Sequence, residues 1–203
     1  MKAFQIFQAL SPELARGVFQ HLRDEQKDIY KSVLTSLAQE KRLRPVFVQR
    51  KPVVEQIAWM IGTCKLKVVD SIAEHILQIW LLKAQKELIL AFLKSLDIEH
   101  DEDGTVEDLP DELDSKKLKS TVTMLLKTYE PETLTVYLHV FQLQQPGGWE
   151  PLTKMLESDD RLFLGEPPAA AEPEPEPEAE PEPEAAAEPE PEPESEAAAE
   201  EKE

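Results

Sequence analysis

The chain has 203 residues, of which 41% are hydrophobic and 31% are charged, and its formal net charge at neutral pH is −19. This length allows one or two domains. The single cysteine, Cys64, excludes an internal disulfide and a zinc site built from several cysteines. A reducing, cytoplasmic environment is therefore the simplest expectation.

The last part of the chain, residues 166–203, has a composition unlike that of a folded domain. It contains 16 of the 41 acidic residues and 10 of the 17 prolines, and apart from proline it has no apolar residue larger than alanine. Such a segment cannot offset its conformational entropy by burying a core. We therefore predict two parts, an all-helical domain over 1–165 and a disordered acidic tail over 166–203.

Charge divides the predicted domain into two halves. Residues 1–96 carry 15 basic against 9 acidic side chains, a net charge of +6, whereas residues 97–165 carry 6 against 16, a net charge of −10. Such a division can select a charged partner or favour docking between the halves. The plainer interpretation is that these charges only solvate exposed faces.

The first elements in chain order read as helices. Ser11-Pro12-Glu13 places a capping residue, a proline and an acid at the start of a helix over 12–22, and apolar residues recur every three or four positions over 29–37. We expect a helix hairpin that ends before Pro45. The apolar segment 53–61 predicts a central helix stopped by Gly62, and a capping box at 71–74 predicts the start of the next helix.

The helical pattern continues toward residue 165. Because Lys83 would interrupt the apolar face of the helix from residue 71, we expect a turn over 83–86. Further helices are expected over 88–96, 118–126, 131–141 and 149–156, and the segments 44–52 and 65–69 are expected to be extended connections. The result is a single compact multi-helix domain, arranged as an irregular bundle or a solenoid-like helical array.

No export signal or membrane-spanning segment is expected. The beginning of the chain lacks the composition of a signal peptide. The most apolar stretch, residues 76–93, is interrupted by Lys83 and Lys86, so no run reaches the ~18 apolar residues that a membrane span requires. We therefore expect no membrane partner.

The sequence EHDEDGTVEDLP, residues 99–110, suggests a calcium site at first reading. With Gly104 at the turn position of an EF-hand loop, Glu99, Asp101 and Asp103 fall at ligand positions one, three and five. Position twelve requires a carboxylate that binds the ion with both oxygens, but this position is Pro110. We predict no useful calcium affinity, and instead a connection turned by Gly104 and ended by Pro110.

Motifs for catalysis and cofactors are absent from the sequence. The four histidines have no metal-ligand spacing, and there is no phosphate-binding glycine loop or nucleophile elbow. Cys64 and His75 are the residues to consider as a nucleophile or a general base, and without evident partners both favour a structural interpretation. We predict no catalytic, cofactor or metal site, and no cofactor.

The clearest candidate site is KRLRPVFVQRK, residues 41–51, which has five bases, no acid and an apolar trio at its centre. Extended alternation would place Phe47 opposite Val46 and Val48. Such a segment can bind nucleic-acid phosphate and stack a base on Phe47; the alternative is a solvated loop whose Phe47 lies in the core. The predicted partner-binding residues are Lys41, Arg42, Arg44, Phe47, Arg50 and Lys51.

These observations predict a non-enzymatic helical interaction or scaffold protein with an acidic disordered tail, and a protein as its partner. One alternative is a nucleic-acid or polyanion binder that uses the basic segment 41–51 and is modulated by the tail. A second alternative is an enzyme with an unrecognised pocket. The tail solubilises and spaces the domain, competes with phosphate at the basic segment, or captures a basic partner. The sequence leaves the oligomeric state open.

Overall fold

The computed structural model describes residues 1–165, and the predicted acidic tail lies outside the described residues. Within this range the chain forms ten α-helices, one short 3₁₀ helix and no strand, so the all-α prediction is confirmed. The elements are α1 (Ala3–Ala9), α2 (Pro12–Glu25), α3 (Lys27–Glu40), α4 (Pro45–Gln49), α5 (Val53–Cys64), η1 (Lys67–Val69), α6 (Asp70–Ala84), α7 (Lys86–Ser95), α8 (Ser115–Leu125), α9 (Pro131–Leu143) and α10 (Glu150–Ser158). None of these helices is long and apolar enough to cross a bilayer.

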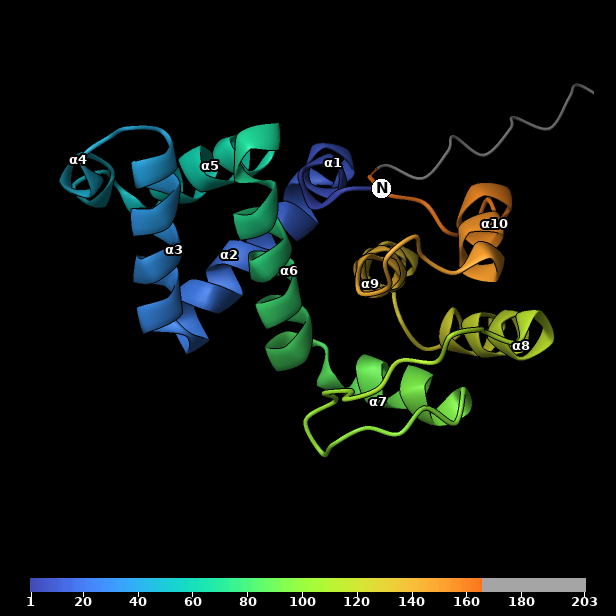
Figure 1. Ribbon diagram of the computed structural model, residues 1–203. Helices are drawn as coiled ribbons and strands as arrows, with labels where there is room; N and C mark the ends of the chain where they lie inside the picture. The colour runs from blue at the N-terminus through green and yellow to red at the C-terminus, as the bar shows by residue number, and fades with distance from the viewer. Residues whose placement is uncertain (166–203) are drawn as a thin grey trace, which may run out of the picture. The chain divides into compact units, whose positions relative to one another are not determined.

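Helix α6 occupies the centre of this arrangement. It packs against α1, α2, α3 and α5 and also against α7 and α9, and in Figure 1 it crosses between α3 and α9. Its buried residues are Ala73, Ile76, Leu77, Trp80 and Leu81. In a solenoid each repeat contacts only its neighbours. Because α1 packs against both α6 and α9, the helices form an irregular bundle.

The prediction that the helix over 53–61 lies at the centre is wrong. Val54 and Ala58 of α5 are exposed, so this helix lies at the surface. It also continues through Gly62 to Cys64, because Thr63 and Cys64 are buried and their packing supports a further turn.

The start of α6 also differs from its prediction. The helix begins at Asp70, directly after η1, so the segment 65–69 is partly 3₁₀-helical and not extended. The proposed capping box over 71–74 is wrong because the chain enters α6 already helical. The carboxylate of Asp70 instead accepts a hydrogen bond from the backbone N–H of Phe4 at 3.0 Å, which joins α6 to the first turn of α1.

Two predicted helix boundaries are confirmed. The Ser11 hydroxyl accepts from the backbone N–H of Leu14 at 3.2 Å and caps α2, and α6 ends at Ala84 before α7 begins at Lys86. Ser11 also donates its backbone N–H and its hydroxyl to the carboxylate of Glu132, at 2.6 and 2.7 Å. This contact links the start of α2 to the first turn of α9.

Aromatic side chains hold the second half of the domain together. Phe92 of α7 makes edge contacts with Tyr137 and Phe141 of α9, each with ring centroids 5.1 Å apart. Trp149, which precedes α10, stacks on Phe141 at 4.7 Å. Helix α9 buries eight of its thirteen residues, so it forms the core on this side of α6.

Candidate functional site

The candidate segment 41–51 folds as a turn after α3 followed by the short helix α4, so the prediction of an extended segment is wrong. At the end of α3 the backbone N–H of Arg42 donates to Gln39 at 2.8 Å, and that of Leu43 donates to Ala38 at 2.8 Å. These two bonds define a Schellman end, in which glycine usually takes the left-handed position. Here that position is Arg42, with φ of 53°. Pro45 then starts α4, because its fixed φ suits the first helical position.

Helix α4 is held on the domain by one buried side chain and by the Gln56 side-chain amide, which donates to the carbonyl oxygen of Gln49 at 3.0 Å. Val48 is 2% exposed and is the only buried residue of the helix. Phe47 is 60% exposed, and Leu43 and Val46 are also exposed. The interpretation that Phe47 lies in the core is therefore wrong. We call one set of residues the α4 surface: the exposed apolar residues Leu43, Val46 and Phe47 and the bases Lys41, Arg42, Arg44, Arg50 and Lys51.

The bases of the α4 surface are largely free to meet a partner. Lys51 forms an exposed ion pair with Glu55 at 3.0 Å, and the other four bases form no ion pair within residues 1–165. Helix α4 packs chiefly on α3 and lies at the edge of the domain in Figure 1. The structure thus places all six predicted partner-binding residues together at an exposed position.

Helix α5 adds an apolar face that the sequence analysis missed. Val54 is 77% exposed, and Ala58 and Gly62 are exposed as well. Residues four apart lie on one face of a helix, so these three form an outward apolar stripe. Side-chain size could have predicted this exposed face from the sequence. The two smallest residues of the segment, Ala58 and Gly62, lie on it, whereas the larger Ile57 and Met60 are buried.

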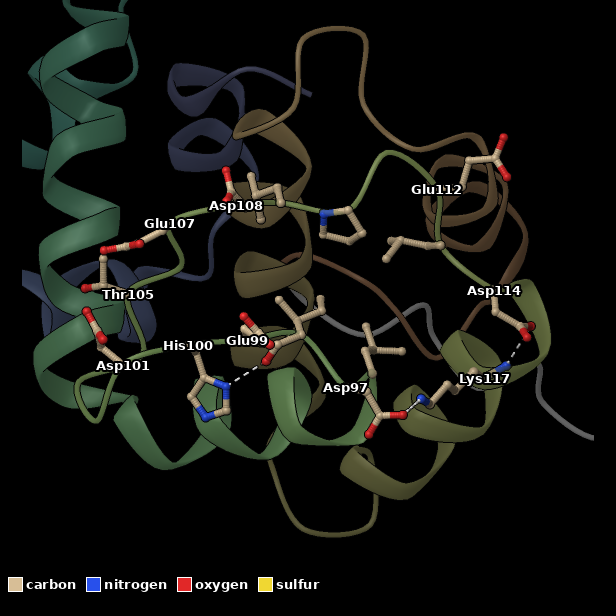
Figure 2. Close-up of a pocket in the computed structure, with 15 residues that line it drawn as sticks. Asp97, Glu99, His100, Asp101, Thr105, Glu107, Asp108, Glu112, Asp114 and Lys117 are labelled. Atoms are coloured by element: carbon tan, nitrogen blue, oxygen red, sulfur yellow. Dashed lines mark hydrogen bonds and ion pairs between the residues drawn. The ribbon is translucent and has the colours of Figure 1, made fainter.

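The acidic segment between α7 and α8 begins in the same way as the segment after α3. The backbone N–H of Asp97 donates to Lys94 at 3.2 Å, that of Ile98 donates to Leu93 at 3.0 Å, and Asp97 takes the left-handed position with φ of 55°. Figure 2 shows the chain running from Asp97 past His100, turning, and returning past residues 107–108. The two limbs of this connection lie side by side.

The predicted turn at Gly104 is confirmed. The backbone N–H of Asp101 donates to the carbonyl of Thr105 at 2.9 Å, and Gly104 has φ of 88°. A Cβ at this position would lie 2.9 Å from Cγ2 of Ile89, so both the conformation and the space require glycine. The carboxylate of Asp103 accepts from the backbone N–H of Thr105 at 3.0 Å, and this bond lowers the pKa of Asp103.

The end of the EF-hand-like sequence has a structural role. The indole N–H of Trp149 donates to the carbonyl oxygen of Pro110 at 2.8 Å, which ties the returning limb to the segment before α10. No group of three or more histidine, cysteine, aspartate or glutamate side chains within residues 1–165 is arranged to hold a metal ion. The absence of useful calcium affinity remains a prediction for solution measurement.

The connection encloses a groove of about 1060 Å³. Its apolar lining residues are Leu96, Ile98, Leu109, Pro110 and Leu113, and its acidic lining residues are Asp97, Glu99, Asp101, Glu107, Asp108, Glu112 and Asp114. Figure 2 shows these acids distributed along both limbs and around the start of α8. We call this feature the acidic groove.

Two of the groove's acids have partners in the fold. Asp97 forms an ion pair with Lys117, and Asp114 caps α8 by accepting from the backbone N–H groups of Lys116 and Lys117 at 2.7 and 3.2 Å. These backbone bonds lower the pKa of Asp114. By contrast, Glu99, Glu107, Asp108 and Glu112 form no hydrogen bond or ion pair within residues 1–165.

Cys64 and His75, the residues considered for catalysis, do not assemble into a site with each other or with His139. Cys64 is completely buried, and burial raises its pKa to about 12, so the thiol stays protonated at neutral pH. His75 is exposed and has no hydrogen-bond partner among the described residues. His139 is half-buried, and burial lowers its pKa to about 4, which keeps the imidazole neutral. No nucleophile is paired with a base among these three.

Comparison with known proteins finds no match to any protein-family model, any curated protein or any solved structure.

Proposed function

We propose that this chain is a non-enzymatic interaction protein that uses the α4 surface to bind an acidic protein segment carrying apolar side chains. The observation that carries this proposal is the 60% exposure of Phe47 at the centre of exposed bases. Burying such a ring on a partner removes its apolar surface from water, which favours binding by ~25 cal/mol for each Å² buried. The surrounding bases steer an acidic partner and set its orientation.

The aliphatic neighbours of Phe47 favour a protein over a nucleic acid. Leu43 and Val46 are exposed beside it, and Val54 is exposed in the first turn of the next helix. These aliphatic side chains have neither a charge nor a hydrogen-bond donor for a phosphate group. Proteins that bind single strands usually provide several aromatic rings for successive bases. A peptide segment in which acids flank leucine or phenylalanine satisfies both the bases and the apolar residues.

The backbone at Arg42 supports a functional role for its side chain. A residue other than glycine in the left-handed conformation costs about 1 kcal/mol. Glycine would relieve this cost, yet the chain has an exposed guanidinium at the position. Local strain of this kind is concentrated at functional sites.

Nucleic-acid binding remains the second candidate. Four exposed bases without ion pairs in the described domain, next to an exposed aromatic ring, are the elements of a single-strand site. This candidate predicts affinity for an oligonucleotide that falls steeply with salt. The acidic tail would then compete with phosphate at the same bases.

A peptide-display selection on the full chain tests the proposal. We expect enriched peptides to combine acids with leucine or aromatic residues, and Phe47→Ala to weaken their binding at least tenfold, since about 1.4 kcal/mol corresponds to a factor of ten. Met124→Ala removes another exposed apolar side chain, on α8, and should leave binding unchanged. A selection that yields no such peptides, or peptides indifferent to Phe47→Ala, would contradict the proposal.

Fluorescence anisotropy distinguishes nucleic-acid binding from peptide binding. The probe is a single-stranded oligothymidine of about 15 nucleotides, which is within the site size of single-strand binders. Oligonucleotide binding that depends on Phe47 and weakens steeply with salt would favour it over the protein partner.

A further inference from the structure

We infer that the α4 surface of one copy of this chain docks into the acidic groove of a second copy, so that the protein self-associates head to tail. This inference rests on the proposed function, in which α4 is the docking element, and it names the partner surface. The α4 surface and the groove are the two most strongly and oppositely charged segments of the described domain, and each also has an apolar centre.

Charge complementarity is the first argument. The α4 surface has five bases, and only Lys51 has an acidic partner within residues 1–165. The groove is lined by seven acids against one lysine, Lys117, which is already paired with Asp97. Bringing the two together places unpaired bases of one copy among unpaired acids of the other. Such complementarity steers association and fixes its register.

Apolar complementarity is the second argument. Phe47 and Val46 are exposed whereas Val48 is buried, so this five-residue helix presents an exposed apolar surface. The groove has an apolar lining that includes Leu96 and Leu109, and its volume of about 1060 Å³ accommodates several side chains. A charged rim around an apolar centre is the usual arrangement at protein interfaces.

The two surfaces cannot meet within one molecule. Helix α4 packs chiefly on α3, whereas the groove is formed between α7 and α8. Figure 1 shows α4 and the α7–α8 connection on opposite sides of α6. The contact is therefore between copies. Because it joins two different surfaces, each copy keeps one of them free, and association continues into open chains or a ring.

The association is expected to be weak and sensitive to salt. A short helix in a groove buries less than the ~1,200 Å² of a standard interface, which places it among transient contacts. Exposed charges are screened beyond ~8 Å at physiological ionic strength. The acidic tail of each chain, with a net charge of −15 over residues 166–203, also competes for the same bases.

Sedimentation velocity on the full chain tests this inference, over roughly 10 µM to 1 mM protein, the range suited to a weak complex. The wild type should sediment faster as its concentration rises, and less so as salt is added. The double variant Arg44→Glu, Arg50→Glu should lose at least tenfold in association constant, because it places acids against acids. The double variant Glu107→Lys, Asp108→Lys should lose as much, and an equal mixture of the two variants should associate again because the reversed charges match.

Matched controls change the same charges elsewhere. Glu102→Lys with Asp111→Lys alters two exposed acids of the same connection that do not line the groove, and Arg16→Glu with Lys83→Glu alters two exposed bases away from α4. Both control variants should associate like the wild type. Controls that weaken association as much as the test variants, or a failure of the mixture to recover, would overturn the inference.

The outcome is separable from that of the proposed function. A wild-type chain that remains monomeric at 10 mM to 20 mM salt, a low ionic strength at which screening is weak, overturns head-to-tail association. The α4 surface would keep its role if acidic peptides still bound to it through Phe47. If neither self-association nor binding of acidic peptides through Phe47 is observed, the proposed function is contradicted as well.

Discussion

The segments that follow α3 and α7 begin alike and then diverge. Each leaves its helix through the same pair of backbone hydrogen bonds, with a charged residue, Arg42 or Asp97, in the left-handed position. After α3 the chain becomes helical again at Pro45 and is held by the buried residue Val48 and by the Gln56 side-chain amide, which donates to the carbonyl oxygens of Gln49 and Lys51. After α7 it forms an irregular loop tied to the core through Trp149. The same helix end thus leads to a projecting helix or to a groove, depending on which buried side chain is available to hold the chain.

The largest expected effect is on the acidic connection between α7 and α8. Trp149→Ala removes a buried ring that stacks on Phe141 and the donor to Pro110, so the free energy of unfolding should fall by about 3–5 kcal/mol. Urea denaturation measures the loss, and hydrogen exchange should show faster exchange in the connection than in α4. Trp149→Phe keeps a stacked ring and should cost about 1 kcal/mol, the value of one hydrogen bond. Equal costs for both variants would contradict this account.

The next largest effect is on α4, in the basic segment. Val48→Ala removes the one buried side chain of α4, and the free energy of unfolding should fall by about 2 kcal/mol. Hydrogen exchange should then increase at α4 and remain unchanged in the connection. Val46→Ala, at an exposed position of the same helix, should change stability by less than about 0.5 kcal/mol. If the two variants were equally destabilised, α4 would not depend on the burial of Val48.

A smaller effect tests the shared helix end. Arg42→Gly should raise the free energy of unfolding by up to about 1 kcal/mol, because glycine adopts the left-handed conformation without steric cost. The same variant should bind acidic peptides more weakly, since it lacks the guanidinium. Urea titrations with an unchanged m value measure the stability. Arg42→Ala is the control, because alanine keeps the steric cost; destabilisation by Arg42→Gly would mean that the arginine side chain supports the fold.

The exposed ring should matter for binding and hardly at all for folding. Phe47→Ala should change the free energy of unfolding by less than about 0.5 kcal/mol, in contrast to Val48→Ala one position away. Thermal and urea denaturation of the two variants under identical conditions make this comparison. A loss of 2 kcal/mol or more on replacing Phe47, the cost typical of a core residue, would place the ring in the core in solution.

The smallest expected effect distinguishes the two segments by their response to the acidic tail. The tail has a net charge of −15 and is tethered to the domain, so we expect weak contacts with the α4 surface to be populated although each exposed pair contributes only about 0–1 kcal/mol. Removing residues 166–203 should shift the amide resonances of residues 41–51 at low salt and leave those of residues 99–112 unchanged. The shifts should fade as salt rises. Identical spectra with and without the tail would limit it to solubilising and spacing the domain.

The sequence by itself determined the helical class, the start of α2 and the turn between α6 and α7. These features depend on local chemistry: Ser11 caps a backbone N–H three residues away, and the position of Lys83 breaks an apolar face. The cluster of bases over 41–51 was also evident, because charge is a property of composition and needs no fold.

Only the tertiary structure decided which apolar residues are exposed and which loop becomes a groove. Phe47 and Val48 are neighbours of similar apolar character, yet only Val48 is buried in the short helix that packs on α3. In the same way Val54 was expected in a central helix, but the central position belongs to α6, which packs against helices from both halves of the domain. The acidic groove depends on a bond between Pro110 and Trp149, 39 residues apart, and no local pattern in the sequence encodes a contact over that distance.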